Sequence, residues 1–346
     1  MGFREFSKEE LDSVLASMGV TDQTDVGRYG SGHINDTFKV ETRRGVRYIL
    51  QRVNTEIFPD LAMLEDTVRR VTGHLAAKGV KSLEVLGYEG PWRLFAFLEG
   101  YVSHDVVEDP SQAYCAACAF AKFQDDLSDL PPPRLGEIIP RFHDTPDRLR
   151  LLDASARADV RGRAAGVARE LAFVDARRAD ASRIMDLMAS GAIPERVVHN
   201  DSKINNVLVA PGGDAVVIDL DTTMPGCALS DFGDMVRASS AAAAEDEADL
   251  SKVYSRRDLF AALARGYLKC AKFLCEAERE NLVFAGRLST FEVGVRFLTD
   301  YLSGDNYFHV AYPEHNLVRA RNQFKMVESL EAQAADYEEI VRAAES

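Results

Sequence analysis

The first hundred residues contain short apolar segments of the kind that form β-strands. These segments are Thr37–Glu41, Tyr48–Arg52, Val85–Gly87 and Trp92–Phe97, and β-branched and aromatic residues are frequent in them. A helical pattern over Leu61–Lys78 lies between the second and the third segment. The order strand, strand, helix, strand, strand predicts a small lobe built mainly on an antiparallel sheet.

Beyond residue 101 the apolar positions recur at the three- and four-residue spacing of amphipathic helices. The exception is a hairpin, in which Val207–Val209 and Ala215–Ile218 flank the turn residues Pro211–Asp214. With 346 residues the chain is long enough for two lobes. We therefore predict an α+β fold with a small lobe in residues 1–100 and a larger helical lobe in residues 101–346. The predicted helices of the larger lobe are Pro110–Leu127, Pro146–Leu152, Arg157–Ser190, Ser255–Glu278, Phe291–Leu302 and Leu317–Ala344.

The net charge of the chain argues against two classes of binding partner. The chain has 41 Lys and Arg residues against 55 Asp and Glu residues, a formal net charge of −14 at pH 7. Such a surface repels nucleic acid backbones and anionic membrane faces, so we expect neither as a partner. Hydrophobic residues make up 46% and charged residues 28% of the sequence, the balance of a soluble globular protein.

The N-terminal segment and the cysteines favour a cytoplasmic protein. Met1–Val20 has the pattern of a charged amphipathic helix and lacks the apolar run of a signal peptide. The five cysteines are an odd number without a disulfide framework, which suits a reducing compartment. Cys115 and Cys118 form a CxxC pair that we interpret as helix packing, because a second pair for zinc is missing. We expect a monomer or a homodimer.

The strongest chemical signal is a polar loop between two apolar strands. Its sequence VVHNDSKINNVLV, residues 197–209, contains the pattern His-x-Asp-x4-Asn, formed by His199, Asp201 and Asn206. The hairpin that follows returns the chain as VVID and ends on Asp219. Because two short strands fix the ends of the loop, we expect the side chains of Asp201, Asn206 and Asp219 to converge.

This set of side chains suits phosphoryl transfer. A carboxylate must orient or deprotonate the attacking hydroxyl, and we assign this role to Asp201. Mg²⁺ takes few protein oxygens and fills its octahedron with water and phosphate, which suits Asn206 and Asp219 as ligands. Lys203 and His199 complete the predicted catalytic residues, with Lys203 placed to reach the transferring phosphate. The alternatives are a solvated loop lysine and, for the whole motif, a hairpin with incidental caps.

The loop resembles the catalytic loop shared by protein kinases and the aminoglycoside phosphotransferase family, which implies a bilobal, protein-kinase-like fold. Residues 231–233 spell the DFG triplet that protein kinases use for magnesium, yet Asp231 lies beyond the hairpin that carries the predicted ligand. We interpret Asp231 either as a brace that bonds His199 or as a helix N-cap. Asp221, two residues after the predicted ligand, is expected either to assist the metal or to be solvated.

The nucleotide site is expected at the front of the small lobe. A glycine-rich segment, residues 30–32, precedes the first predicted strand, and glycines let backbone amides approach phosphates closely. Protein kinases place a lysine on the next strand, but this chain has Gln-Arg there, which leaves Glu65 on the following helix without a certain partner. The predicted nucleotide contacts, with two from the hinge after the last strand, are Gly30, Ser31, Gly32, Gln51, Arg52, Glu99 and Tyr101.

Longer segments of the sequence make the resemblance more specific. They are GHINDTF at 32–38, YILQRVN at 48–54, HNDSKINNV at 199–207, IDLDTTMPG at 218–226 and RFLTDYLSGDNYF at 296–308. These segments resemble the N-acetylhexosamine 1-kinase branch of the phosphotransferase family, in which Gln-Arg stands where protein kinases have the strand lysine. The resemblance implies ATP and Mg²⁺ as cofactors and a sugar as substrate. It also implies a pocket in which Asp201 faces the anomeric hydroxyl while His33, Arg296 and Tyr307 hold the acceptor.

The predicted acceptor residues suit a neutral sugar. Arg and His donate to sugar oxygens or to an acetamide carbonyl, and Tyr adds a ring face. Arg296 disfavours a cationic acceptor. The competing interpretations are an i,i+4 pair of Arg296 with Asp300 and a core position for Tyr307. Two other functions stay open, namely a kinase of another polyol, sugar or amino alcohol, and an inactive, kinase-shaped nucleotide-binding protein, which the missing lysine supports.

Overall fold

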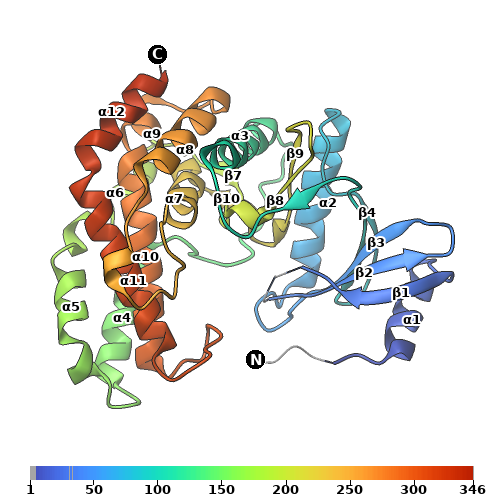
Figure 1. Ribbon diagram of the computed structural model, residues 1–346, viewed down its shortest axis with the longest axis horizontal. Helices are drawn as coiled ribbons and strands as arrows, with labels where there is room; N and C mark the ends of the chain where they lie inside the picture. The colour runs from blue at the N-terminus through green and yellow to red at the C-terminus, as the bar shows by residue number, and fades with distance from the viewer. Residues whose placement is uncertain (1–4, 31, 33, 346) are drawn as a thin grey trace.

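The computed structural model describes residues 5–30, 32 and 34–345 and places a five-stranded sheet at one end of the molecule and a helical body at the other (Figure 1). The strand order is β1-β2-β3-β5-β4, and every neighbouring pair is antiparallel. The predicted small antiparallel lobe is confirmed. Its elements are α1 (Lys8–Ser17), β1 (Gln23–Arg28), β2 (Asp36–Thr42), β3 (Arg47–Arg52), α2 (Leu61–Ala77), β4 (Val85–Glu89) and β5 (Trp92–Ala96).

Strand β1 is the one element of this sheet that the sequence does not predict. It lies at the sheet edge, pairs with β2 alone, and has Val26 as its one large apolar residue. A strand of this composition forms because its neighbour offers a complete set of backbone partners, and local propensity contributes little.

The two faces of the sheet pack against different parts of the molecule. Leu50 and Trp92 belong to the core that includes Leu11 and Leu15 of α1, whereas Phe95 belongs to the core that includes α2 and the large lobe. Successive side chains of a strand point to opposite faces. Residues next to Leu50 and Trp92 in the chain therefore lie on the face toward α2 and the large lobe.

Short strand pairs hold the polar loop of the large lobe. The predicted hairpin is confirmed, because β8 (Val207–Val209) and β9 (Ala215–Val217) pair antiparallel. β6 (Val102–Ser103), the first element after the hinge, pairs with β8, and β7 (Arg196–Val198) pairs with β10 (Met224–Gly226). Both ends of the loop between β7 and β8 are thus fixed by backbone hydrogen bonds.

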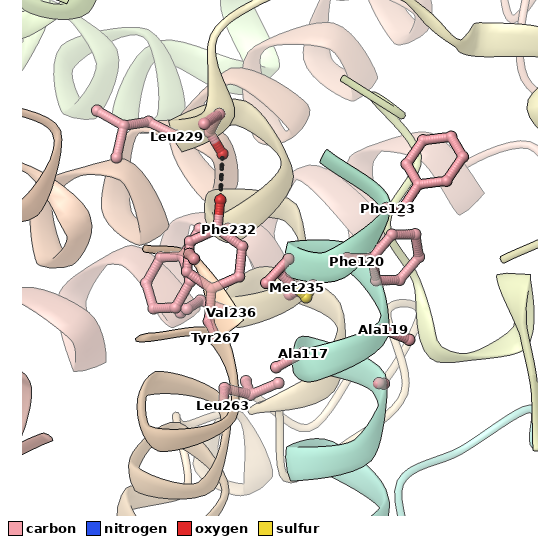
Figure 2. Packing of buried hydrophobic residues seen from close by; sticks show 14 of the residues in the cluster. Ala117, Ala119, Phe120, Phe123, Leu229, Phe232, Met235, Val236, Leu263 and Tyr267 are labelled. Atoms are coloured by element: carbon pink, nitrogen blue, oxygen red, sulfur yellow. Dashed lines mark hydrogen bonds between the residues drawn. The ribbon is translucent and has the colours of Figure 1, made fainter. Parts of the chain in front are cut away.

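Helices form the rest of the large lobe. Within the described residues no helix combines the length and the apolar character that crossing a bilayer requires. Figure 2 shows the core where α3 (Pro110–Asp126), α7 (Ala228–Ser239) and α8 (Arg257–Cys270) meet. The rings of Phe232 and Tyr267 pack together with their centres 5.1 Å apart, and the Tyr267 hydroxyl donates to the Ala228 carbonyl oxygen at 3.3 Å. The helices are α3 (Pro110–Asp126), α4 (Thr145–Ala158), α5 (Ala168–Asp175), α6 (Arg183–Ala189), α7 (Ala228–Ser239), α8 (Arg257–Cys270), α9 (Glu276–Glu280), α10 (Leu282–Ser303), α11 (His315–Ala332) and α12 (Ala334–Glu345).

The structure corrects several predicted helix boundaries. The helix predicted over Arg157–Ser190 is divided, because Asp159 ends α4 in the left-handed conformation with φ of 38° and Gly162 follows with φ of 65°. The helix predicted over Ser255–Glu278 is α8 and α9, and the one over Leu317–Ala344 is α11 and α12. Helix α7 is not predicted, since its sequence is rich in Ser, Asp and Gly, residues with low helix propensity.

The cysteines differ from the expectation of a chain without disulfides. Cys118 of α3 and Cys270 of α8 are joined by a disulfide. The close packing of the two helices brings their Cα atoms to 5.6 Å, within the range that a disulfide spans. A separation of 152 residues leaves no local sequence signal for this pair. Cys115 lies on the same helix as Cys118 and is half-buried, as expected of helix packing.

Candidate active site

The carboxylate of Asp231 on α7 supports the loop between β7 and β8. One oxygen accepts the backbone N–H of His199 at 2.9 Å and the other accepts that of Asn200 at 2.6 Å. Gln124 of α3 also donates to Asp231, at 2.6 Å. The N-cap of α7 is Cys227, so the N-cap interpretation of Asp231 is wrong. The interpretation of Asp231 as a brace is confirmed, with the backbone of His199 as its partner.

His199 lies inside the loop. The residue is fully buried, and the rings of Phe120 and Phe123 pack edge-on against the imidazole. Nε2 donates to the Ile218 carbonyl oxygen at 2.8 Å, while Nδ1 accepts the backbone N–H of Asp201 at 3.3 Å. A ring with one donor and one acceptor in use is neutral imidazole. His199 therefore positions Asp201, which differs from the catalytic role that the sequence suggests.

Asp201 is held at both carboxylate oxygens. Oδ1 lies 3.0 Å from Nζ of Lys203, and Oδ2 accepts a hydrogen bond from Nδ2 of Asn206 at 3.0 Å. Burial opposes ionisation of Asp201, but the charge and hydrogen bond of Lys203, together with other positive charges nearby, outweigh burial and keep the pKa of Asp201 below its usual value. Asp201 is thus an ionised carboxylate at neutral pH. Lys203 is paired with it rather than free in solvent, and its contact with a phosphate remains a prediction.

Asn206 and Asp219 fit a magnesium ion. Nδ2 of Asn206 is engaged by Asp201, which leaves the amide oxygen for a cation. Asp219 adopts the left-handed conformation, with φ of 59° and ψ of 60°. Burial, followed by the charges of Asp221 and Asp201, raises the pKa of Asp219 to about 6, so the site carries more negative charge than its surroundings balance. A divalent cation would supply that balance.

No larger metal-binding cluster competes with this site. Among residues 5–30, 32 and 34–345, no group of three or more His, Cys, Asp or Glu side chains is arranged to hold a metal ion. A magnesium ion at Asn206 and Asp219 would therefore complete its octahedron with water and phosphate oxygens, as Mg²⁺ commonly does.

Asp221 has a place that neither sequence interpretation foresees. It is 2% exposed and lies 2.6 Å from the guanidinium of Arg93, which is also 2% exposed. Arg93 is on β5, and its guanidinium also donates to Gln51 of β3. Asp221 is thus neither solvated nor free for a metal. The sequence signal for this cluster is an arginine inside the short apolar strand WRLFA, because a buried charge requires a partner.

The predicted nucleotide residues are only partly brought together. Gly30 has the positive φ of 81° that favours glycine, whereas Ser31 lies outside the described residues. Gln51 lies on the sheet face toward the large lobe, but Arg52 lies on the opposite face, where its guanidinium stacks over Phe6 at 5.9 Å. The structure therefore separates Arg52 from Gln51, because adjacent residues of a strand point to opposite faces.

The two hinge residues are engaged in contacts of their own. Glu99 forms an ion pair with Arg47 of β3, which ties the hinge to the small lobe. The hydroxyl of Tyr101 donates to Asp214 in the turn of the β8–β9 hairpin at 2.5 Å, which ties the hinge to the large lobe. These contacts fix the hinge backbone, while contact of Glu99 and Tyr101 with a nucleotide remains a prediction.

Two of the predicted acceptor residues, Arg296 and Tyr307, lie close together. The guanidinium of Arg296 is 5.9 Å from the ring centre of Tyr307 and 5.1 Å from that of Phe142. Asp300 accepts the backbone N–H groups of residues 306–308, each at 2.9 Å, so the interpretation of an Arg296–Asp300 pair is wrong. Tyr307 is 56% exposed and is not a core residue. His33, the third predicted acceptor residue, lies outside the described residues.

A buried ion pair that the sequence does not suggest lies beside Arg296. Nδ1 of His143 is 2.9 Å from Glu292 on α10, and the hydroxyl of Thr145 donates to the other oxygen of Glu292 at 2.6 Å. The pair borders a cavity of about 30 Å³, which has room for a water molecule or two. Burial opposes the charge of His143, but Glu292 outweighs it and raises the pKa of His143 above 6.5. His143 in turn keeps the pKa of Glu292 below 4.5, against the effect of burial.

The ion pair predicts a pH-dependent contribution to stability. The raised pKa of the His143 imidazole stabilises the fold fully below pH 6.5, and this stabilisation is lost as the pH rises through the raised pKa. The lowered pKa of the Glu292 carboxyl stabilises the fold above pH 4.5. We expect His143→Gln to lower the free energy of unfolding most between these values and much less at about pH 9. Urea unfolding at a pH between 4.5 and 6.5 and at about pH 9 tests this expectation, and His309→Gln, at an exposed position, is the control. An equal loss at both pH values contradicts the charged pair.

The sequence model of the phosphotransferase enzyme family matches residues 25–270, well over half of the chain, including the whole loop from His199 to Asp219. The chain belongs to this family. The match covers the glycine-rich segment, strands β2 to β5, the hinge and the loop braced by Asp231, whereas Glu292, Arg296 and Tyr307 lie beyond it.

Several solved structures that are similar to this chain are named as small-molecule kinases or phosphotransferases. A choline/ethanolamine kinase family protein from Mesorhizobium loti has 18% sequence identity and a TM-score of 0.61, over 97% of this chain and 98% of that chain. An aminoglycoside phosphotransferase from Alicyclobacillus acidocaldarius has 14% identity and a TM-score of 0.59, over 99% and 98% of the two chains. A spectinomycin phosphotransferase in complex with ADP and spectinomycin has 12% identity and a TM-score of 0.59, over 95% and 99%. The predicted protein-kinase-like fold is confirmed.

Proposed function

We propose that this phosphotransferase transfers the γ-phosphoryl group of ATP to the anomeric hydroxyl of an N-acetylhexosamine. The observation that carries the phosphoryl transfer is the juxtaposition of an ionised Asp201 with the oxygens of Asn206 and Asp219 on one loop and its hairpin, and the choice of acceptor rests on the resemblance of the sequence segments. Asp201 accepts or orients the proton of the attacking hydroxyl. Asn206 and Asp219 would hold a magnesium ion, which would supply positive charge against the phosphates.

Charge matching on the acceptor side supports a neutral acceptor. Asp234 of α7 accepts hydrogen bonds from Arg237 at 2.8 Å, and it lies close enough to raise the pKa values of both Lys203 and His143. The carboxylate of Glu292 is matched by His143. In the described part of the chain Arg296 forms no ion pair of its own. Its guanidinium contacts aromatic rings, and Glu292, whose charge is close enough to interact with it, is already paired with His143. The charge of Arg296 would repel an ammonium group, and its guanidinium offers a donor to a carbonyl or hydroxyl oxygen.

The reaction is tested by product chemistry. The protein is incubated with Mg·ATP and a panel of N-acetylhexosamines, other free sugars and polyols, and the products are read by phosphorus NMR. We expect a phosphate signal coupled to an anomeric proton, formed with an N-acetylhexosamine. A phosphate on a primary hydroxyl, or no product with any sugar, overturns the proposal.

A second candidate function is phosphorylation of an amino alcohol. It is favoured by the structural neighbours, several of which are choline or ethanolamine kinases, for example one from Mesorhizobium loti and one from Streptococcus pneumoniae. Choline and ethanolamine therefore belong in the same panel. A product with either of them, and none with a sugar, selects this second function and removes the role of Arg296 as an acceptor donor.

Arg296 provides a test of the acceptor site itself. We expect Arg296→Met to raise the KM for the sugar by about 10- to 100-fold, since one charge-assisted hydrogen bond is lost, while the KM for ATP is unchanged. Arg319→Met is a matched control, because Arg319 also lies over an aromatic ring, that of Phe297, and donates to a backbone carbonyl of the same loop. Equal effects of both variants on the KM for sugar would show that Arg296 acts only through packing.

A further inference from the structure

A buried polar cluster joins the small lobe to the turn that carries Asp219. Arg93 of β5 donates from Nε to Gln51 of β3 at 2.9 Å and from Nη2 to Oδ2 of Asp221 at 2.8 Å. Its Nη1 lies 2.6 Å from Oδ1 of Asp221. The guanidinium therefore contacts both oxygens of one carboxylate, and the two residues come from different lobes.

A second contact from the small lobe reaches the same carboxylate. Asn35, which follows the glycine-rich segment and is 8% exposed, donates from Nδ2 to Oδ2 of Asp221 at 2.7 Å. Its amide oxygen accepts the backbone N–H of Asn54 after β3 at 2.9 Å. The end of the glycine-rich segment and the middle of the sheet are thus both bound to Asp221.

The position of Asp221 gives these contacts a consequence for the metal site. Asp221 lies in the 3₁₀ turn Leu220–Thr222, which begins directly after Asp219. Asp219 is a non-glycine residue with φ of 59°, a conformation that costs energy and persists where the surroundings enforce it. Arg93 and Asn35 supply such a restraint, because they fix the turn two residues away from Asp219.

The usual link between nucleotide, sheet and helix in protein kinases is absent. That link is a lysine of the third strand paired with a glutamate of the following helix. Here the strand carries Gln51, which is bonded to Arg93 and Thr37. Glu65 of α2 pairs with Arg69 one turn along its own helix, at 2.7 Å. The charged contact between the sheet and the magnesium turn is instead made by Arg93.

We propose that Arg93 and Asp221 are positioning residues that hold Asp219 in its magnesium-binding orientation and align the small lobe on it. Neither touches the reacting atoms. The proposal rests on Asp219 as a magnesium ligand, and it does not depend on which acceptor is phosphorylated. Its test therefore uses binding of Mg²⁺ and ADP without any acceptor.

The main test removes both charges at once. A buried ion pair replaced by apolar residues of similar size often leaves stability unchanged, whereas removing one partner strands a buried charge. The double variant Arg93→Met/Asp221→Leu is therefore expected to fold, while each single variant is expected to be much less stable. Calorimetric titration of ADP over a range of Mg²⁺ concentrations should show the Mg²⁺ requirement raised by about 10- to 100-fold in the double variant, the size typical of lost outer-shell partners.

A matched control separates this effect from a general loss of structure. Arg177, two residues after the end of α5, and Glu331 of α11 form a bidentate ion pair within the large lobe, at 2.9 and 2.7 Å. Arg177→Met/Glu331→Leu should leave the Mg²⁺ requirement unchanged. Asn35→Ala, which strands no charge, should raise the requirement by a smaller factor than the double variant.

The outcomes are distinct. A folded double variant, or Asn35→Ala, with the wild-type Mg²⁺ requirement overturns the proposal, and so does an equal shift in the Arg177/Glu331 control. Asp219→Asn with an unchanged requirement also overturns it, because Asp219 is then not a ligand. If Mg·ADP binding follows the expected pattern and no sugar is phosphorylated, the positioning role stands and only the proposed acceptor fails.

Discussion

Asp201→Asn is expected to lower turnover by about 10²- to 10⁴-fold while the affinity for Mg·ATP stays nearly unchanged. The side chain keeps its size, and its oxygen can still accept the hydrogen bond from Asn206. What is lost is the negative charge that orients the acceptor hydroxyl and accepts its proton, and with it the ion pair with Lys203. Steady-state kinetics with the sugar identified by phosphorus NMR, together with calorimetry of Mg·ATP, give the two quantities separately.

A control is needed because any change on the large lobe could slow the enzyme. Asp175→Asn is suitable, since Asp175 is an exposed carboxylate at the end of α5 that also pairs with a neighbouring basic residue, Arg178. We expect wild-type turnover for this control. Unchanged turnover in Asp201→Asn would remove Asp201 from the mechanism, and equal loss of nucleotide binding would show that its role is structural.

The loop from His199 to Asn206 can be predicted because its signal is local. Strands flank it on both sides, and a short hairpin must return Asp219 close to its end. The spacing cannot tell which side chain points outward. His199 turns into the core against Phe120, a residue far away in the sequence, so its positioning role follows only from the packing of α3.

The contacts of Arg93 with Gln51 and Asp221, which join the two lobes, could not be predicted from sequence patterns. The register of β3 and β5 places Gln51 directly opposite Arg93, and the placement of the lobes then adds Asp221. Each step depends on pairing between distant segments. The sequence predicts only that a charged side chain inside an apolar strand has a partner, and it does not identify that partner.

Helix α7 also could not be predicted from the local sequence. Gly233 lies so close to α10 that an added Cβ would meet the Ala285 carbonyl oxygen at 2.5 Å. Its glycine is therefore required by packing, although it lowers the helix propensity of the segment. Local propensity argues against a helix there, and tertiary contact forms one.

Asp231→Asn is expected to lower the free energy of unfolding by roughly 3 to 5 kcal/mol, because a buried acceptor of several hydrogen bonds is lost. The carboxylate receives the backbone N–H groups of His199 and Asn200 and the amide of Gln124. An asparagine would turn an N–H₂ group toward one of these donors. Urea unfolding measures the loss, and Asp175→Asn, which changes an exposed carboxylate away from the loop, serves as the comparison.

The same variant decides how the DFG triplet of this chain is used. If Asp231 were a magnesium ligand, as its counterpart is in protein kinases, the Mg²⁺ requirement for ADP binding would rise with little loss of stability. As a brace, Asp231 leaves that requirement unchanged in the fraction that stays folded, and the loss appears in stability. Asp219→Asn should do the reverse, since it removes a carboxylate crowded by Asp221 and Asp201 and takes away a metal ligand. Opposite results for the two variants establish that the hairpin aspartate binds the metal and that the DFG aspartate holds the loop.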